Sequence, residues 1–203
     1  MNGVIKIDKE EIGKRAVYAT LGARNYALQD RQVDDFYATD PKALELLLEQ
    51  EKFSNNVWEC ACGQGHLSKV LVSNGYNTRS TDLMDRGYGQ SGVDFLKQEE
   101  AFDGDIITNP PYKYALDFVK KAYNLVTDGH KVAMLLRIQF LEGKERRQFF
   151  DYAPPRTVYV SSSRIHCAMN GDFKTYNKSS AMCYAWFVWQ KGNKNPPIIK
   201  WFN

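Results

Sequence analysis

A short tetrapeptide, Asn109-Pro110-Pro111-Tyr112, combines residue types that can activate a nitrogen nucleophile. An amine on an aromatic ring is a poor nucleophile, because its lone pair is delocalised into the ring. The side-chain oxygen of Asn109 and the carbonyl oxygen of Pro110 can each accept a hydrogen bond from such an amine. Two N–H bonds held in this way favour a tetrahedral nitrogen and free its lone pair. The tetrapeptide is therefore suited to chemistry at an exocyclic amine.

The prolines and the tyrosine suit the same chemistry. Proline fixes φ, so Pro110 and Pro111 hold the Pro110 carbonyl inward whether or not a substrate is present. The ring of Tyr112 can stack on a planar base and stabilise positive charge that develops on nitrogen. The alternative interpretation is an ordinary proline turn that joins a strand to a helix.

A second unusual turn, Gly63-Gln64-Gly65, follows a short apolar segment. Glycine has no Cβ, so the backbone of such a turn can approach a ligand closely. Taken alone, the pattern also fits a purely structural turn. The segment continues to Ser68 without the third glycine of the dinucleotide fingerprint, which disfavours a nicotinamide-dependent oxidoreductase.

Acidic residues lie around this turn at positions where they could hold a cofactor. Asp82 closes the second expected strand, where its carboxylate can accept from both hydroxyls of a ribose. Asp94 is placed to accept from an adenine amino group, and Phe95 can pack on the ring. Glu59 can counter the charge of an ammonium or sulfonium group. For Asp82 alone, a helix N-cap is an equally good interpretation.

The elements that must position these residues alternate between strands and helices. The expected strands cover residues 57–61, 76–81, 92–96, 105–108, 131–138, 156–160 and 181–190. The expected helices cover residues 42–51, 66–74, 115–126 and 143–152, and Thr39 or Asp40 can cap the first of them with Pro41 at its first position. This alternation predicts an α/β, Rossmann-like parallel sheet with helices on both faces. The two late strands predict one antiparallel edge strand.

Ligands of open α/β sheets lie at the carboxyl ends of the strands. In this sequence those ends carry the glycine turn, Asp82, Asp94 and the Asn109 tetrapeptide. The sequence therefore predicts one site that combines both turns.

Length and composition indicate one soluble domain. The chain has 203 residues, of which 43% are apolar and 25% charged. We expect an N-terminal arm over residues 1–35 and a single domain over residues 36–203. No stretch approaches the roughly 20 apolar residues that span a membrane, and no secretory signal is visible, so we expect a cytoplasmic protein without a membrane partner.

The cysteines are better explained by packing than by a metal. Cys60, Cys62 and Cys167 could in principle converge with His66 on a metal ion. Their spacing is not the C-x2-C pairing of zinc sites, and no second pair is present. We expect reduced, structural cysteines and no metal.

Basic residues are concentrated in the last third of the chain. Residues 1–136 hold 16 Lys and Arg against 20 Asp and Glu, whereas residues 137–203 hold 11 against 4. Such asymmetry favours a polyanionic partner, with an ordinary solvated face as the alternative. Within a polar loop over residues 161–178 and the helix before it, the candidate phosphate contacts are Arg146, Arg147, Arg164 and Lys174.

Taken in order, these motifs resemble those of a known family. Glu59-x-x-Cys62-Gly63-x-Gly65, Asp82, Asp94-Phe95 and Asn109-Pro-Pro-Tyr112 resemble the motifs of class I S-adenosylmethionine (AdoMet)-dependent methyltransferases that methylate amino groups. Residues 36–41 are similar to the motif that precedes the first strand in such DNA enzymes. Residues 139–143 and 184–189 resemble small bacteriophage and prophage adenine-N6 methyltransferases, and the likeness covers about residues 36–190.

The resemblance implies a seven-stranded methyltransferase sheet, AdoMet as methyl donor, and residues 109–112 as the catalytic turn. It also implies cofactor contacts of three kinds. Glu59, Gly63 and Gly65 would lie near the methionine part, Asp82 at the ribose, Asp94 and Phe95 at the adenine, and Tyr37 and Thr39 over the methionyl end.

The substrate is left open among several nitrogen nucleophiles. The tetrapeptide fits adenine N6 in DNA, which the basic last third favours, and also fits a base in RNA or the side-chain amide of a protein glutamine. A non-catalytic nucleic-acid-binding module with the same fold is a further alternative. The chain is short for a methyltransferase with its own target-recognition domain, so a separate specificity partner is also possible.

Overall fold

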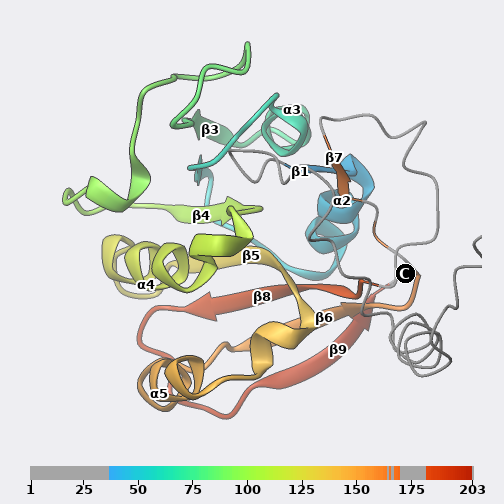
Figure 1. Ribbon diagram of the computed structural model, residues 1–203, viewed down its shortest axis with the longest axis vertical. Coiled ribbons are helices and arrows are strands. Elements are labelled where there is room, and N and C mark those ends of the chain that lie inside the picture. The colour runs from blue at the N-terminus through green and yellow to red at the C-terminus, as the bar shows by residue number, and fades with distance from the viewer. Residues whose placement is uncertain (1–36, 164, 166, 170–181, 203) are drawn as a thin grey trace, which may run out of the picture. The chain divides into compact units, whose positions relative to one another are not determined.

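A mixed, mostly parallel sheet lies at the centre of the protein (Figure 1). The computed structural model describes residues 37–163, 165, 167–169 and 182–202. The strands of this sheet are β2 (Asn56–Glu59), β3 (Asn77–Ser80), β4 (Asp105–Thr108), β5 (Lys131–Arg137), β6 (Thr157–Ser161), β8 (Tyr184–Gln190) and β9 (Ile198–Phe202). They stand in the order β3-β2-β4-β5-β8-β6-β9, which confirms the predicted seven-stranded α/β sheet.

The antiparallel strand is inside the sheet, and our prediction of an antiparallel edge strand is wrong. β8 is antiparallel to both of its neighbours, β5 and β6, whereas every other pairing in the sheet is parallel. All residues of β8 up to Trp189 are buried. A strand that is apolar on both faces gains most from a central position, where both faces are covered.

Two further segments differ from the expectation. The strand expected over residues 92–96 is a loop followed by the 3-10 turn η2 (Phe95–Lys97), because the carboxylate of Asp94 accepts from the Leu96 amide at 3.1 Å and caps that turn. Strand β9 was not expected at all. Four of its five residues are exposed, so its sequence lacks the alternation that marks a half-buried strand.

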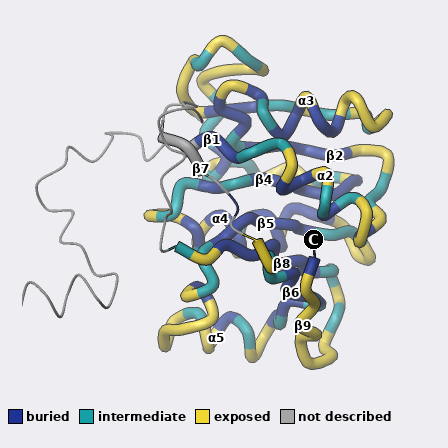
Figure 2. Tube along the Cα trace, turned by 90° about the vertical axis from the view of Figure 1, so that its right-hand side faces the viewer, coloured by how far each residue is buried: buried dark blue, intermediate teal, exposed yellow. Residues whose placement is uncertain are grey.

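Helices cover both faces of the sheet, as predicted. The α-helices are α2 (Pro41–Gln50), α3 (His66–Ser73), α4 (Ala115–Leu125) and α5 (Lys144–Tyr152), and short 3-10 turns η3 (Tyr112–Tyr114) and η4 (Ile138–Leu141) follow β4 and β5. Helices α4 and α5 share one apolar cluster with the sheet, and α2 and α3 share the other. Figure 2 shows the central strands buried and α5 largely exposed. Within the described residues, each helix is too short or too polar to cross a bilayer.

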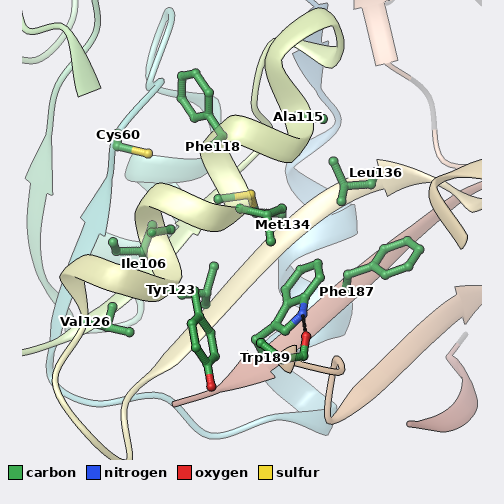
Figure 3. Packing of buried hydrophobic residues seen from close by; sticks show 14 of the residues in the cluster. Cys60, Ile106, Ala115, Phe118, Tyr123, Val126, Met134, Leu136, Phe187 and Trp189 are labelled. Carbon is green, nitrogen blue, oxygen red and sulfur yellow. Dashed lines mark hydrogen bonds between the residues drawn. The ribbon is translucent and has the colours of Figure 1, made fainter. Parts of the chain in front are cut away.

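The side chains of strand β5 pack alternately into the two apolar clusters. Met134 and Leu136 belong to the cluster under α4, whereas Ala133 and Leu135 belong to the cluster under α2 and α3. Alternate side chains of a strand point to opposite faces, so a strand covered on both sides reads as one continuous apolar run. Figure 3 shows Met134 and Leu136 together with Phe187 of β8 on the α4 side.

The start of α2 follows from its sequence. Asp40 is the N-cap, its carboxylate accepts from the Lys42 amide at 2.9 Å, and Pro41 occupies the first turn. Both features were predicted. Just before this cap lies β1 (Tyr37–Thr39), which pairs antiparallel with β7 (Cys167–Met169) in a small separate sheet. Residues 1–36 lie outside the described residues, so the arm over residues 1–35 stays a prediction.

Candidate active site

The carboxyl ends of β2, β3 and β4 lie side by side, because these three strands pair in parallel. The glycine turn follows β2, Asp82 follows β3, and Asn109 follows β4. Residues that are far apart in the sequence therefore meet at one edge of the sheet, as the sequence predicts.

The glycine turn has the backbone conformation that requires glycine. Gly63 has φ of 53° and Gly65 has φ of 78°, in the left-handed region that other residues rarely adopt. Gly65 is also the N-cap of α3. A Cβ at Gly65 would lie 2.4 Å from the ring of Tyr88, so the loop after β3 folds directly onto this turn.

Asp82 is a buried carboxylate held by backbone amides. Its Oδ2 accepts from the Gly63 amide at 2.8 Å, and its Oδ1 accepts from the Met84 amide at 2.9 Å. Each carboxylate oxygen has a second lone pair, so Asp82 can accept further hydrogen bonds from hydroxyl groups. It thus connects the glycine turn to the loop that covers it.

Glu59 is a buried acid at the end of β2. Its side chain accepts a short hydrogen bond from the Ser68 hydroxyl, which in turn lies 2.6 Å from the hydroxyl of Ser80. Burial raises the pKa of Glu59 to about 8, more than the Ser68 hydrogen bonds lower it. Glu59 is therefore mostly protonated at neutral pH in the unliganded protein, and a nearby cation would favour its ionised form.

Asp94 and Phe95 follow in the expected order but have structural contacts. Besides capping η2, Asp94 forms an ion pair with Lys97 at 3.2 Å. The ring of Phe95 is buried, with its centroid 5.3 Å from that of Trp58 and 5.1 Å from that of Phe118. A role for both at an adenine ring stays a prediction.

Asn109 is tied to β1. Its Nδ2 donates to the hydroxyl of Thr39 at 2.8 Å, and Thr39 is buried. This hydrogen bond turns the amide oxygen of Asn109 away from Thr39 and limits rotation of the amide. Pro110 and Pro111 then lead into η3, which begins with Tyr112. Tyr37 lies two residues before Thr39 on β1, and its side chain is outside the described part of the chain.

Solved structures with the same architecture identify the fold. A protein from Listeria monocytogenes, named as a class I S-adenosylmethionine-dependent methyltransferase, matches with a TM-score of 0.58 and 14% identity, over 97% of this chain and 74% of that one. A modification subunit of a type I restriction enzyme from Vibrio vulnificus matches with a TM-score of 0.56 and 11% identity, over 97% of this chain but 52% of its own. An RNA methyltransferase from Pyrococcus horikoshii matches with a TM-score of 0.51 and 16% identity, over 74% and 83%. The chain has the class I methyltransferase fold. No protein-family model and no curated protein sequence matches it.

Two residues beside the Asn109 tetrapeptide were not predicted as site residues from the sequence. The Tyr112 ring stacks on Tyr184 of β8, with centroids 5.8 Å apart and an interplanar angle of 28°. The guanidinium carbon of Arg137 lies 4.9 Å from the centroid of the same ring. Arg137 ends β5 and is the direct cross-strand partner of Tyr184. The position of Arg137 directly after a long apolar segment could have marked it as a candidate site residue. Its pairing with Tyr184 of β8 could not be predicted from the sequence.

The predicted basic contacts are only partly described. Arg146 donates to the Gln139 carbonyl of η4 at 2.7 Å and lies over the Phe140 ring. Arg147 forms an ion pair with Asp151 along α5 at 2.7 Å. The other two candidates, Arg164 and Lys174, lie outside the described residues.

Proposed function

We propose that this protein transfers the methyl group of AdoMet to an exocyclic amine, with adenine N6 in DNA as the substrate. The observation that carries the proposal is the Asn109-Pro-Pro-Tyr112 turn. It follows β4 at the sheet edge that also holds the glycine turn and Asp82, and its amide is oriented by Thr39.

The residues around the glycine turn fit AdoMet. Asp82 is buried, is fixed by two amides, and keeps lone pairs for the ribose hydroxyls. Gly63 and Gly65 have no side chains that would keep a ligand away from the backbone. Glu59 would ionise to balance the positive charge of the methionine part. Thr39 and Tyr37 would cover the methionyl end, as the family resemblance implies. AdoMet, when bound, supplies an electrophilic methyl group.

The catalytic turn would act on the acceptor nitrogen. The oxygen of Asn109 and the carbonyl of Pro110 accept from the two N–H bonds of the amine, which localises its lone pair. The prolines hold that carbonyl in place before the substrate arrives, so little reorganisation is needed. Tyr112 supports the base by stacking and favours the cationic nitrogen that forms during transfer.

A nucleic acid is the acceptor that the charge distribution favours. Residues 137–203 carry 11 basic against 4 acidic residues, and phosphate contacts need such an excess. The likeness of residues 36–41 to DNA methyltransferases supports DNA as the substrate. The likeness of residues 139–143 and 184–189 to small phage and prophage adenine-N6 methyltransferases supports adenine. A target adenine in a duplex would have to be flipped out to reach Tyr112. A separate specificity partner would supply further recognition surface.

The test is methyl transfer from isotopically labelled AdoMet to duplex DNA, single-stranded DNA, total RNA and protein extract, with mass analysis of the product nucleosides. We expect N6-methyladenine in DNA. Label in RNA or protein alone would contradict the DNA assignment but retain the chemistry. No label in any sample, despite AdoMet binding, would favour a non-catalytic module or a missing partner.

The matched variants are Asn109→Ala and Asn195→Ala, since Asn195 is an exposed asparagine in the turn before β9. We expect Asn109→Ala to lower methyl transfer at least about 100-fold while AdoMet still binds. Asn195→Ala should match the wild type. Loss of AdoMet binding in Asn109→Ala would show that the catalytic turn is misassigned.

A further inference from the structure

Arg137 is a cation at the carboxyl ends of the central strands that has no anionic partner among the described residues. It is half-buried at the carboxyl end of β5, next to β4 and therefore next to the Asn109 turn. In the part of the chain that the structure describes, no carboxylate lies within ion-pair distance of Arg137. Its buried Nε has no hydrogen-bond partner there. A guanidinium that is partly withdrawn from water and unpaired is suited to bind an anion.

The surroundings of Arg137 direct it to the base pocket. Its guanidinium lies over the ring of Tyr112, and its cross-strand partner Tyr184 stacks on that same ring. Tyr184 is buried in β8, so it provides a fixed support. The guanidinium of Arg137 ends a long side chain and is held by a cation–π contact, which is weaker than an ion pair. It can therefore turn to a ligand without disturbing the sheet.

The two described arginines of α5 contrast with Arg137. The charge of Arg147 is balanced by Asp151, and Arg146 is already used in a hydrogen bond to η4. Exposed charges on a helix are also screened by salt, whereas a half-buried charge is screened less. Of these three guanidinium groups, Arg137 is the one that is both unpaired and adjacent to the catalytic turn.

We propose that Arg137 binds a backbone phosphate of the substrate strand beside the base that stacks on Tyr112. The inference rests on the proposed function, because it requires a nucleic-acid substrate. The planar guanidinium can donate two parallel N–H bonds to a phosphate, which fixes the strand as well as attracting it. Such a contact would hold the phosphodiester next to the flipped base while Tyr112 holds its ring.

The test compares the wild type with Arg137→Gln, Arg137→Lys and Lys120→Gln. Lys120 is an exposed lysine of α4, and its variant removes the same charge away from the site. The probe is a DNA oligonucleotide that the wild-type protein methylates, and its affinity is measured over a series of salt concentrations. AdoMet affinity and thermal unfolding of each variant report whether the fold is intact.

For Arg137→Gln we expect DNA binding about tenfold weaker at about 0.1 M salt, and a slope of log affinity against log salt that is smaller by about 1. Arg137→Lys should keep the slope but bind less tightly, because an ammonium cannot make the paired contact. Lys120→Gln and the AdoMet affinities should be unchanged.

An unchanged slope for Arg137→Gln would overturn the inference while leaving the proposed function in place. Weakened AdoMet binding in the same variant would also overturn it, since Arg137 would then act on the cofactor side. A wild-type protein that methylates RNA or protein and not DNA would refute the DNA assignment separately. With an RNA substrate, the same slope change in Arg137→Gln would support a phosphate contact, and an unchanged slope would refute it. A protein substrate would overturn the inference, because it requires a nucleic acid.

Discussion

At the scale of single residues, the site depends on polar groups whose orientation is fixed before any ligand binds. Asp82 is fixed by two amides, Glu59 by Ser68, and Asn109 by Thr39. Apart from the Met84 amide, which lies two residues after Asp82, these partners come from other elements of the fold, so the sequence motif alone does not specify the geometry. Preorganised polar groups act without the cost of reorientation during the reaction.

The buried acid Glu59 predicts a pH dependence of cofactor binding. Burial raises the pKa of Glu59 to about 8, so the group is protonated at neutral pH without a ligand. A bound cation would lower that pKa again, and the proton would be released on binding. We therefore expect AdoMet affinity to rise with pH until about pH 8 and then to level off. Calorimetric titration in two buffers of different ionisation enthalpy measures the released proton, and Glu59→Gln should abolish the release.

The hydrogen bond between Asn109 and Thr39 predicts that Thr39 positions the side-chain amide of Asn109 for the proposed methyl transfer. Thr39→Val keeps the shape of the side chain and removes the hydroxyl that accepts from Nδ2. We expect kcat at saturating AdoMet to fall about tenfold, since one hydrogen bond is worth about 1.4 kcal/mol. Thr39→Ser should restore the wild-type rate. A weaker AdoMet affinity with unchanged kcat would show that Thr39 acts on the cofactor alone and does not position Asn109.

At the scale of elements, the loop after β3 is packed onto the glycine turn. Gly65→Ala would force a side chain into a left-handed position and place its Cβ 2.4 Å from the Tyr88 ring. Gly75→Ala is the matched control, because Gly75 has φ of 85° with open space around it. We expect the control to lose about 1 kcal/mol of stability in denaturant unfolding.

Gly65→Ala should lose more, because overpacking adds about 1–3 kcal/mol to the same backbone strain. Adding Tyr88→Ala to Gly65→Ala should remove the steric part, so that the double variant approaches the loss in Gly75→Ala. Equal losses in both single variants would contradict a packed contact between Tyr88 and the glycine turn.

The sequence predicts these elements well where a local pattern determines the structure. The α2 cap at Asp40, the strand at residues 105–108 and the helix at residues 115–125 follow from capping and periodicity. The place of β8 inside the sheet and the pairing of exposed β9 with β6 depend on contacts between distant segments. The motifs at Gly63 and Asn109 are local in the sequence and could therefore be predicted. Arg137 and Tyr184 could not, because they are neighbours only through the pairing of β5 with β8.

At the scale of the whole molecule, one buried carboxylate connects α2 to the amino ends of two strands. Glu51 is the C-cap of α2 and accepts hydrogen bonds from Lys131 of β5 at 2.8 Å, from the Tyr159 hydroxyl of β6 at 2.8 Å, and from Arg156. This cluster lies at the end of the sheet opposite to the Asn109 tetrapeptide. It therefore contributes to stability without taking part in the site.

Burial raises the pKa of Glu51, but the hydrogen bonds from Lys131 and Tyr159 and the charges of Lys131 and Arg156 outweigh it and lower the pKa below its ordinary value. A depressed folded-state pKa means that the ionised form stabilises the fold above the unfolded value of 4.5. That stabilisation is lost as the pH falls through the folded pKa. Acid therefore weakens the attachment of α2 to the sheet.

We expect Glu51→Gln to lower the free energy of unfolding by about 2 kcal/mol at about pH 7, because it leaves two cations without their partner. The loss is smaller than for a fully buried pair, since Arg156 is about one-third exposed. Denaturant unfolding at several pH values should show the difference between wild type and variant shrinking below about pH 4.5. AdoMet affinity should stay unchanged. A difference that persists at acid pH would mean that Glu51 acts through packing and not through its charge.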